Sequence, residues 1–218
     1  MPRQKFDPGL IPSYPDLSFE AELWERGIQW VAGVDEAGRG ALAGPVAAAA
    51  VILPPHQEIQ AELSGVRDSK QMTAKEREHW AECVRRAAIT HAVGFASHQE
   101  IDTLGIVPAT RLAVHRALEA LTVRPEHLLV DFLRLPEEAI PQSAIIKGDA
   151  CCLSVAAASL LAKTARDAVM RQLDGDYPDY RFAAHKGYGT QEHRRAIERF
   201  GACPIHRRSF TLIKVQDD

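Results

Sequence analysis

Four acidic side chains are candidates for binding divalent cations, and they are Asp35, Glu36, Asp131 and Asp167. The first two follow one apolar run, the third ends a second run, and the fourth lies in a long segment of small residues. Carboxylate oxygens are hard ligands, so a cluster of these acids would suit Mg²⁺ or Mn²⁺. Taken singly, each acid could instead cap an element, lie in solvent or pair with a nearby basic residue. A metal centre therefore requires a fold that gathers them.

The run DEAGRGALAGPV places a glycine-flanked arginine directly after the first two acids. Successive residues of a strand point to opposite faces, so Asp35 and Glu36 can share a metal only if the backbone leaves extended geometry there. Gly38 and Gly40 would supply that freedom. The G-R-G spacing matches neither the dinucleotide-binding fingerprint nor the phosphate-binding loop of nucleotide hydrolases. A macromolecular phosphodiester is thus a better candidate ligand than a nucleotide cofactor.

Apolar and β-branched runs predict the strands that would position these acids. The first, residues 28–35, is expected to end at Asp35, and the fourth to end at Asp131. The other three are expected at residues 45–53, 88–97 and 143–149, the last at an edge of the sheet. Three strands precede an alternation of helix and strand, which indicates an α/β fold.

Helices are predicted from capping and stop signals. Ser18 and Gly27 would bound a short helix, Thr73 and Glu76 form a capping box, and Thr190 and Gly201 would bound a final basic helix. Residues 109–121 form a further helix, with Pro108 near its start. Residues 151–173 predict a long helix of small residues that can lie close against the sheet.

The bulk composition fits one globular domain over residues 17–218. The 218 residues are 46% hydrophobic and 25% charged, and residues 1–16 hold four prolines and are expected to form a flexible N-terminal arm. We find no apolar run of about 20 residues and no apolar segment of a secretory signal, so a cytoplasmic location is expected. The four cysteines lack disulfide or zinc spacing, which predicts reduced residues in or near the core.

The basic residues are unevenly distributed. The formal net charge is -3, yet residues 181–214 carry +6 and the remainder -9. Phe182, Tyr188, Phe200 and Phe210 are interleaved with these charges, which suits either a polyanion-binding surface or an ordinary solvated basic helix. Three histidines of this segment, His185, His193 and His206, do not have zinc-ligand spacing, and proximity to phosphate would suffice to explain them.

Five motifs resemble those of bacterial ribonuclease HII, a type 2 ribonuclease H family. They are VDEAGRGALAGPV, DSK, GDACCLSVAAASLLAKTARDAVM, YPDYRFAAHKGYGT and HRRSF, in this order between residues 34 and 210. The resemblance implies an α/β fold with a ribonuclease H-like mixed β-sheet flanked by helices and a small C-terminal helical region. It also implies an endoribonuclease that hydrolyses the RNA strand of RNA/DNA hybrids and cuts 5′ of ribonucleotides embedded in duplex DNA, as in ribonucleotide excision repair.

The resemblance further implies a role for nine residues. Asp35, Glu36, Asp131 and Asp167 would be the catalytic metal ligands, holding Mn²⁺ or Mg²⁺ for two-metal-ion hydrolysis that leaves 3′-OH and 5′-phosphate ends. Gly38, Arg39 and Gly40 would recognise the ribose 2′-OH, Lys70 would lie near a substrate phosphate, and Tyr188 would pack on a sugar. The expected partners are RNA/DNA hybrid and ribonucleotide-containing duplex DNA. The protein is expected to act as a monomer and not to bind a membrane.

Several alternatives stay open. Lys70 could be a solvated cation and Tyr188 a core aromatic, Asp149 could be an N-cap, and Lys147 has no assigned role. The chain departs from the family pattern at Phe132, at Gly105 and at the Cys151 and Cys152 pair, but not at the four acids. Ribonuclease HIII, a silent hybrid-binding module and a small-molecule phosphotransferase are the competing functions.

Overall fold

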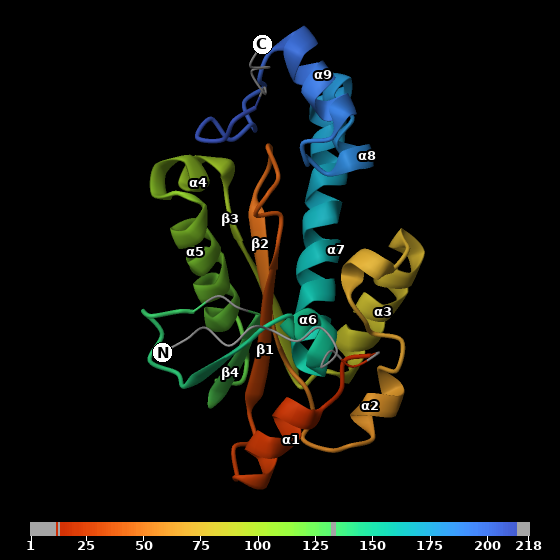
Figure 1. The fold of residues 1–218 in the computed structure, drawn as a ribbon, viewed down its shortest axis with the longest axis vertical. Helices are drawn as coiled ribbons and strands as arrows, with labels where there is room; N and C mark the ends of the chain where they lie inside the picture. The colour runs from red at the N-terminus through yellow and green to blue at the C-terminus, as the bar shows by residue number, and fades with distance from the viewer. Residues whose placement is uncertain (1–11, 13, 132–133, 213–218) are drawn as a thin grey trace, which may run out of the picture. The chain divides into compact units, whose positions relative to one another are not determined.

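The computed structural model describes residues 12, 14–131 and 134–212, and within them the chain forms a mixed five-stranded sheet flanked by helices (Figure 1). The strand order is β3-β2-β1-β4-β5. The strands are β1 (Val31–Ala37), β2 (Val46–Ile52), β3 (Thr90–Ala96), β4 (His127–Asp131) and β5 (Gln142–Ile145). All five predicted strands are present, and β5 lies at an edge as expected.

The parallel register of three strands brings two predicted acids to the same edge. β1 pairs with β4 in parallel, with Val34 opposite Val130, and β4 pairs in parallel with β5, with Asp131 opposite Ile145. Parallel strands are buried on both faces, which explains why β1 and β4 read as continuous apolar runs. Because Asp35 and Asp131 each follow a paired valine, both lie at the carboxyl edge of the sheet.

The long helix α7 (Leu153–Asp176) lies directly against β1, as its small residues predict. A Cβ atom added to Gly33 would lie 2.1 Å from the backbone carbonyl carbon of Ser154, so no larger residue fits there. Ala156, Ala157 and Ala158 are fully buried. Small side chains on both elements thus allow the backbones of helix and strand to approach closely.

The described chain divides into two compact units. The first contains residues up to 35, 51–91 and 122–160, and the second contains residues 36–50, 92–121 and 161 onward. The first holds α1 (Ser18–Glu25), α2 (Ile59–Glu62), η2 (Ser69–Gln71), α3 (Ala74–Ala87) and α6 (Gly148–Cys151). The second holds α4 (His98–Leu104), α5 (Ile106–Glu119), η3 (Pro178–Tyr180), α8 (Phe182–His185) and α9 (Gln191–Phe200). Helix α7 contributes to both.

The predicted domain limits stay a prediction, since most of the expected arm lies outside the described residues. Asp16, its last residue, forms a bridge with Cys152. All four cysteines are free, as predicted. Cys152 is fully buried, and burial, followed by the charge of Glu20, raises the pKa of its thiol well above the ordinary value.

Predicted capping signals are confirmed at two helices. Thr73 and Glu76 form the capping box at the start of α3, with the Glu76 carboxylate 2.7 Å from the Thr73 backbone nitrogen. The Thr190 hydroxyl accepts from the backbone N–H of His193, and Gly201, with φ +78°, ends α9. Both signals are local, so they act in the same way whatever the tertiary contacts.

Three local predictions were wrong. The N-cap of α1 is Leu17, and Ser18 instead donates its backbone N–H to Asp16. Asp149 lies inside α6, whose N-cap is Lys147, because a left-handed backbone at Lys147 starts the helix two residues earlier. Strand β1 continues two residues beyond Asp35, so Glu36 belongs to the strand.

Candidate metal centre and recognition loop

Three carboxylates meet in the first unit. Asp35, Asp131 and Asp149 each offer one oxygen, and these oxygens lie within 4.8 Å of one another. Asp35 and Asp131 arrive on the parallel strands β1 and β4, and Asp149 follows β5 in α6. Such a set of hard oxygen ligands fits a divalent cation. The sequence predicted two of these acids and missed the third, although its place after the edge strand next to β4 was a usable signal.

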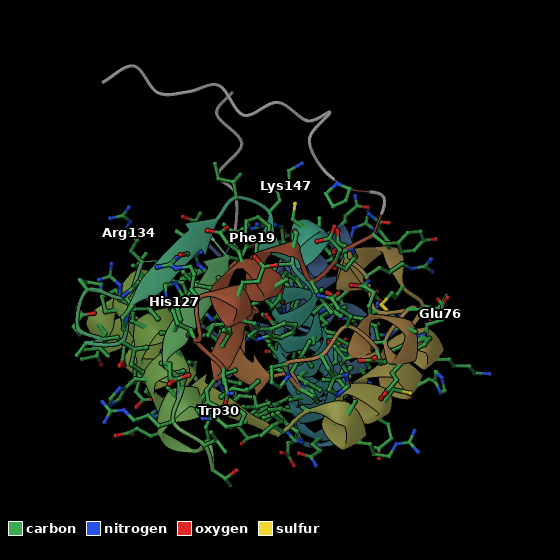
Figure 2. All side chains as sticks on the ribbon, turned by 90° about the horizontal axis from the view of Figure 1, so that it is seen from below. Phe19, Trp30, Glu76, His127, Arg134 and Lys147 are labelled. Atoms are coloured by element: carbon green, nitrogen blue, oxygen red, sulfur yellow. The ribbon has the colours of Figure 1, made fainter. Side chains whose placement is uncertain are left out.

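The turn before Asp149 also orients Asp131. Lys147 has φ +56°, an uncommon left-handed backbone for a lysine, and its side chain is exposed (Figure 2). The next residue, Gly148, donates its backbone N–H to the Asp131 carboxylate at 2.9 Å. A hydrogen bond of this kind fixes a carboxylate and stabilises its charged form. The sequence left the role of Lys147 open. Its left-handed backbone precedes the Gly148 N–H that donates to Asp131, which gives Lys147 at least a structural role.

Lys70 reaches the same group of acids. Its Nζ lies 2.9 Å from an Asp149 carboxylate oxygen, and Asp68 caps the η2 turn by accepting from the Lys70 backbone N–H. Burial lowers the pKa of Lys70, but the hydrogen bond and charge of Asp149, with Asp68 and Asp35, outweigh it and raise the pKa above its ordinary value. Lys70 is thus more than a solvated loop cation. It offsets part of the negative charge that three close carboxylates gather.

The other two predicted acids belong to the second unit. The Glu36 carboxylate lies 2.8 Å from the Arg39 guanidinium, and the Asp167 carboxylate lies 2.6 Å from Lys163 Nζ. The pairing of Asp167 with a neighbouring base, one of its alternative interpretations, is therefore present. That Glu36 and Asp167 also bind metal stays a prediction.

The two glycines of the G-R-G loop differ. Gly38 has φ +91°, and a Cβ there would lie 1.9 Å from Nε of Arg166, so glycine is required both for its backbone and for the close approach. Gly40 has no positive φ, and a Cβ there would meet nothing within 4 Å. The predicted need for conformational freedom is confirmed at Gly38 and wrong at Gly40. The open space at Gly40 instead leaves room for a ligand to approach the backbone.

Tyr188 lies beside this loop within the second unit. It forms a bridge with Ala41, and the backbone N–H of Leu42 donates to Gly187 at 2.7 Å. Two cations lie over the Tyr188 ring, the Arg166 guanidinium 5.2 Å and Lys163 Nζ 5.7 Å from its centroid. The ring is only partly buried, so it is not a core aromatic. Two elements predicted to recognise substrate therefore share one surface region.

Two of the three histidines, His193 and His206, form a buried hydrogen-bonded chain that ends on Tyr188, and the ring of His185 stacks on that of His193. The backbone N–H of Cys203 donates to Nδ1 of His206, the Nε2 atoms of His206 and His193 are 3.1 Å apart, and Nδ1 of His193 lies 3.0 Å from the Tyr188 carbonyl. These contacts assign neutral rings, with His206 donating to His193 and His193 donating to Tyr188. Burial lowers the pKa of all three histidines, that of His193 to about 4.

The basic segment has a core and a surface part. Phe182 and Arg207 are fully buried, which corrects their place on a predicted substrate surface. Arg195 and Arg199 are exposed on α9, and Arg199 lies 4.9 Å from the centroid of the half-exposed Phe200 ring. This outer part of the segment is available to contact a phosphate backbone.

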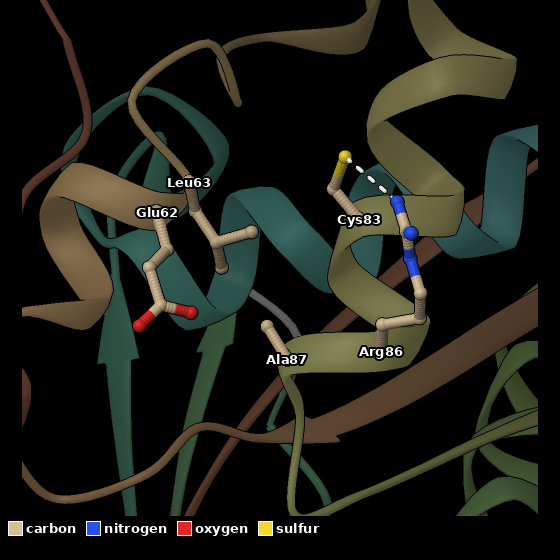
Figure 3. Close-up of a pocket in the computed structure, with 5 residues that line it drawn as sticks. All are labelled: Glu62, Leu63, Cys83, Arg86 and Ala87. Carbon is tan, nitrogen blue, oxygen red and sulfur yellow. Dashed lines mark hydrogen bonds between the residues drawn. The ribbon is translucent and has the colours of Figure 1, made fainter.

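A separate surface pocket lies between α2 and α3 (Figure 3). Glu62, Leu63, Cys83, Arg86 and Ala87 line about 280 Å³ of space. It contains none of the predicted site residues and a single carboxylate, so it lacks the ligand set of a metal centre. No helix of the described part of the chain is long and apolar enough to span a membrane.

Comparison with solved structures identifies the fold. Ribonuclease H2 from Pyrococcus horikoshii superposes with a TM-score of 0.67 at 26% identity, covering 84% of this chain and 94% of that one. Ribonuclease HII from Archaeoglobus fulgidus, solved in complex with PCNA, gives a TM-score of 0.71 at 25% identity, with 85% and 97% covered. The fold is therefore the ribonuclease H-like fold of hydrolytic nucleases.

Sequence comparison then gives the family. The ribonuclease HII family model matches residues 32–213. A ribonuclease HII of Synechococcus sp. is 52% identical over 200 residues, covering 92% of this chain and 90% of the relative, and one of Dehalococcoides mccartyi is 48% identical over 204 residues, with 94% and 96% covered. The chain belongs to the ribonuclease HII family. It is a hydrolase, a ribonuclease H that cuts RNA in RNA/DNA hybrids and depends on divalent metal.

Proposed function

We propose that this enzyme cuts the RNA strand of hybrids, and the DNA strand on the 5′ side of a single embedded ribonucleotide, by two-metal-ion catalysis. The observation that carries the proposal is the meeting of Asp35, Asp131 and Asp149 oxygens within 4.8 Å. Glu36 and Asp167 complete the ligand set in this proposal. The metal ions are Mn²⁺ or Mg²⁺, in keeping with a structurally similar ribonuclease HIII, 22% identical with a TM-score of 0.59, that was solved with Mn²⁺.

The protein residues have separate tasks in the proposed reaction. The bound ions would supply an activated water and stabilise the departing 3′-oxygen, which leaves 3′-OH and 5′-phosphate ends. Asp131, held by the Gly148 N–H, presents a fixed oxygen to the metal centre. Lys70 lies beside Asp149 and can contact a substrate phosphate as it approaches the acids.

Selectivity for RNA requires a polar contact to the 2′-OH, the group that distinguishes a ribonucleotide from a deoxyribonucleotide. We assign that contact to Gly38, Arg39 and Gly40, because the open space at Gly40 admits a sugar close to the backbone. Tyr188, partly exposed beside the same loop, packs on the neighbouring sugar. An enzyme that recognises a single ribonucleotide would act in ribonucleotide excision repair. In this proposal it works as a cytoplasmic monomer.

A duplex DNA with one ribonucleotide tests the proposal. We expect a single cut immediately 5′ of the ribonucleotide in Mn²⁺ or Mg²⁺, no cut in EDTA, and ends that a ligase assay identifies as 3′-OH and 5′-phosphate. An all-DNA duplex of the same sequence is the control. Cleavage of long hybrids without cleavage at a single ribonucleotide would refute the repair role, and a cut on the 3′ side would refute the assignment of the recognition loop.

A further inference from the structure

Two arginines of the second unit are wholly buried. Arg166 and Arg207 have no exposed surface and are the largest such side chains in the described chain. A charge inside a protein is costly unless its hydrogen-bonding capacity is met. Burial lowers the pKa of Arg166, and burial followed by the charge of Arg166 lowers the pKa of Arg207 to about 9. A guanidinium stays protonated in proteins, so the fold must offset the cost of burying two charges.

Five backbone carbonyl oxygens meet this need through six hydrogen bonds, because the Pro45 carbonyl accepts from both arginines. The Arg166 guanidinium donates to the carbonyls of Ala43, Pro45 and Lys186 at 2.8–3.1 Å. The Arg207 guanidinium donates to the carbonyls of Arg39, Gly44 and Pro45 at 2.9–3.1 Å. A guanidinium carries five N–H donors in a rigid plane, which lets one side chain reach three carbonyls. A lysine at either position would leave some of them without a donor.

The five carbonyls belong to the two segments that carry the residues to which the proposed function assigns ribose recognition. Arg207 ties Arg39, at the tip of the G-R-G loop, to Gly44 and Pro45, where the loop returns to the sheet. Arg166 ties that return segment to Lys186, two residues before Tyr188. Arg166 also passes so close to Gly38 that no side chain fits there, and lies over the Tyr188 ring.

We propose that Arg166 and Arg207 are positioning residues that hold the Gly38–Gly40 loop and Tyr188 as one rigid ribose-reading surface. The inference rests on the proposed function of that loop. A backbone that reads a 2′-OH must be fixed to within roughly 0.5 Å, because a looser loop would also accept deoxyribose. The arginines supply this rigidity from inside the protein and touch neither substrate nor metal.

The test compares Arg207→Lys with Arg116→Lys. Arg116 lies in the same unit and binds Glu100 and the Phe95 carbonyl, away from the loop, so it controls for a general loss of stability. Binding is measured in Ca²⁺ to duplexes with and without one ribonucleotide, next to cleavage in Mn²⁺. For Arg207→Lys we expect the preference for the ribonucleotide duplex to fall about tenfold, with the affinity for plain DNA retained. Arg116→Lys should lower the melting temperature and leave the preference unchanged.

Equal preference in wild type and Arg207→Lys would overturn the inference while the proposed function stands. A wild-type enzyme without any preference would overturn the proposed function itself. If Arg207→Lys does not fold, hydrogen exchange of the wild type decides. The Leu42 amide, bonded to Gly187, and its neighbours in residues 38–45 should exchange as slowly as buried strand amides. Exchange at the rate of a free loop would contradict a rigid surface.

Discussion

The acidic group of the first unit and the arginine-held loop of the second solve opposite electrostatic problems. Asp35, Asp131 and Asp149 gather like charges, which Lys70 partly offsets. Arg166 and Arg207 bury cations whose described hydrogen bonds all run to backbone carbonyls. The described hydrogen bonds satisfy the buried charges of the second region within the protein, whereas the first region concentrates carboxylate oxygens that suit a divalent cation. In the proposed function, catalysis therefore depends on concentrated negative charge, and recognition depends on a fixed backbone.

The largest expected effect is on kcat, and it comes from a substitution in the acidic group that leaves the recognition loop unchanged. Asp131→Asn removes one charge from the acidic group but keeps the oxygen that accepts from Gly148. We expect kcat to fall on the order of 10³-fold, because charge stabilisation at the reacting phosphate is lost. Affinity for hybrid in Ca²⁺ should change by no more than about threefold, since the recognition loop is untouched. Near-normal turnover would remove Asp131 from the metal centre.

The next largest effect is on stability, and it should differ between Gly38 and Gly40 of the loop. Gly38→Ala places a methyl group 1.9 Å from Arg166 at a positive φ, and should lower the free energy of unfolding by roughly 2–4 kcal/mol. Gly40→Ala meets open space and should change stability by less than about 0.5 kcal/mol, yet reduce cleavage at a ribonucleotide. Urea denaturation and cleavage assays on both variants give the contrast. A Gly38→Ala protein as stable as Gly40→Ala would disprove the close packing of Arg166.

Acid should destabilise the histidine chain of the second unit. Burial, with the charges of His185, His206 and Arg194, holds the pKa of His193 at about 4, below the ordinary 6.5, although its hydrogen bond to Tyr188 opposes this shift. The unfolded chain then binds more protons, so stability falls as the pH drops from 6.5 towards 4, by on the order of 2–3 kcal/mol from this group. Urea denaturation across that range measures the slope. His193→Gln should have a shallower slope than the wild type, and equal slopes would contradict a buried neutral His193.

The smallest expected effect concerns Lys70. Lys70→Met removes the cation beside Asp149, so Mn²⁺ should bind a few-fold more tightly, while KM for hybrid rises because a phosphate contact is lost. Isothermal titration with Mn²⁺ and steady-state kinetics measure the two changes. Lys75→Met, at an exposed position at the start of α3, is the matched control and should change neither. A parallel change in both variants would assign the effect to net charge alone.

The sequence by itself determined the elements and most of the chemistry. Apolar runs placed all five strands, and the local signals at Thr73 and Thr190 placed two helix starts, because capping depends on residues three apart. The motifs carried the family and the acids Asp35 and Asp131. Helix α4 was missed although Ser97 and Glu100 form the same capping box, because its periodic apolar pattern is short.

Only the tertiary structure decided which charges serve which purpose. The sequence offered Asp149 only as a possible helix cap, and the structure brings it beside Asp131. The sequence predicted Lys70 near a substrate phosphate, with a solvated cation as the alternative, and did not predict its contact with Asp149, 79 residues away in the chain. Arg207 was counted in the basic segment of residues 181–214 and Arg166 had no such role, yet both are buried and donate to carbonyls more than 100 residues distant. The physical reason is that a charged side chain takes its role from its partners, and partners remote in sequence are specified only when the sheet and helices have packed.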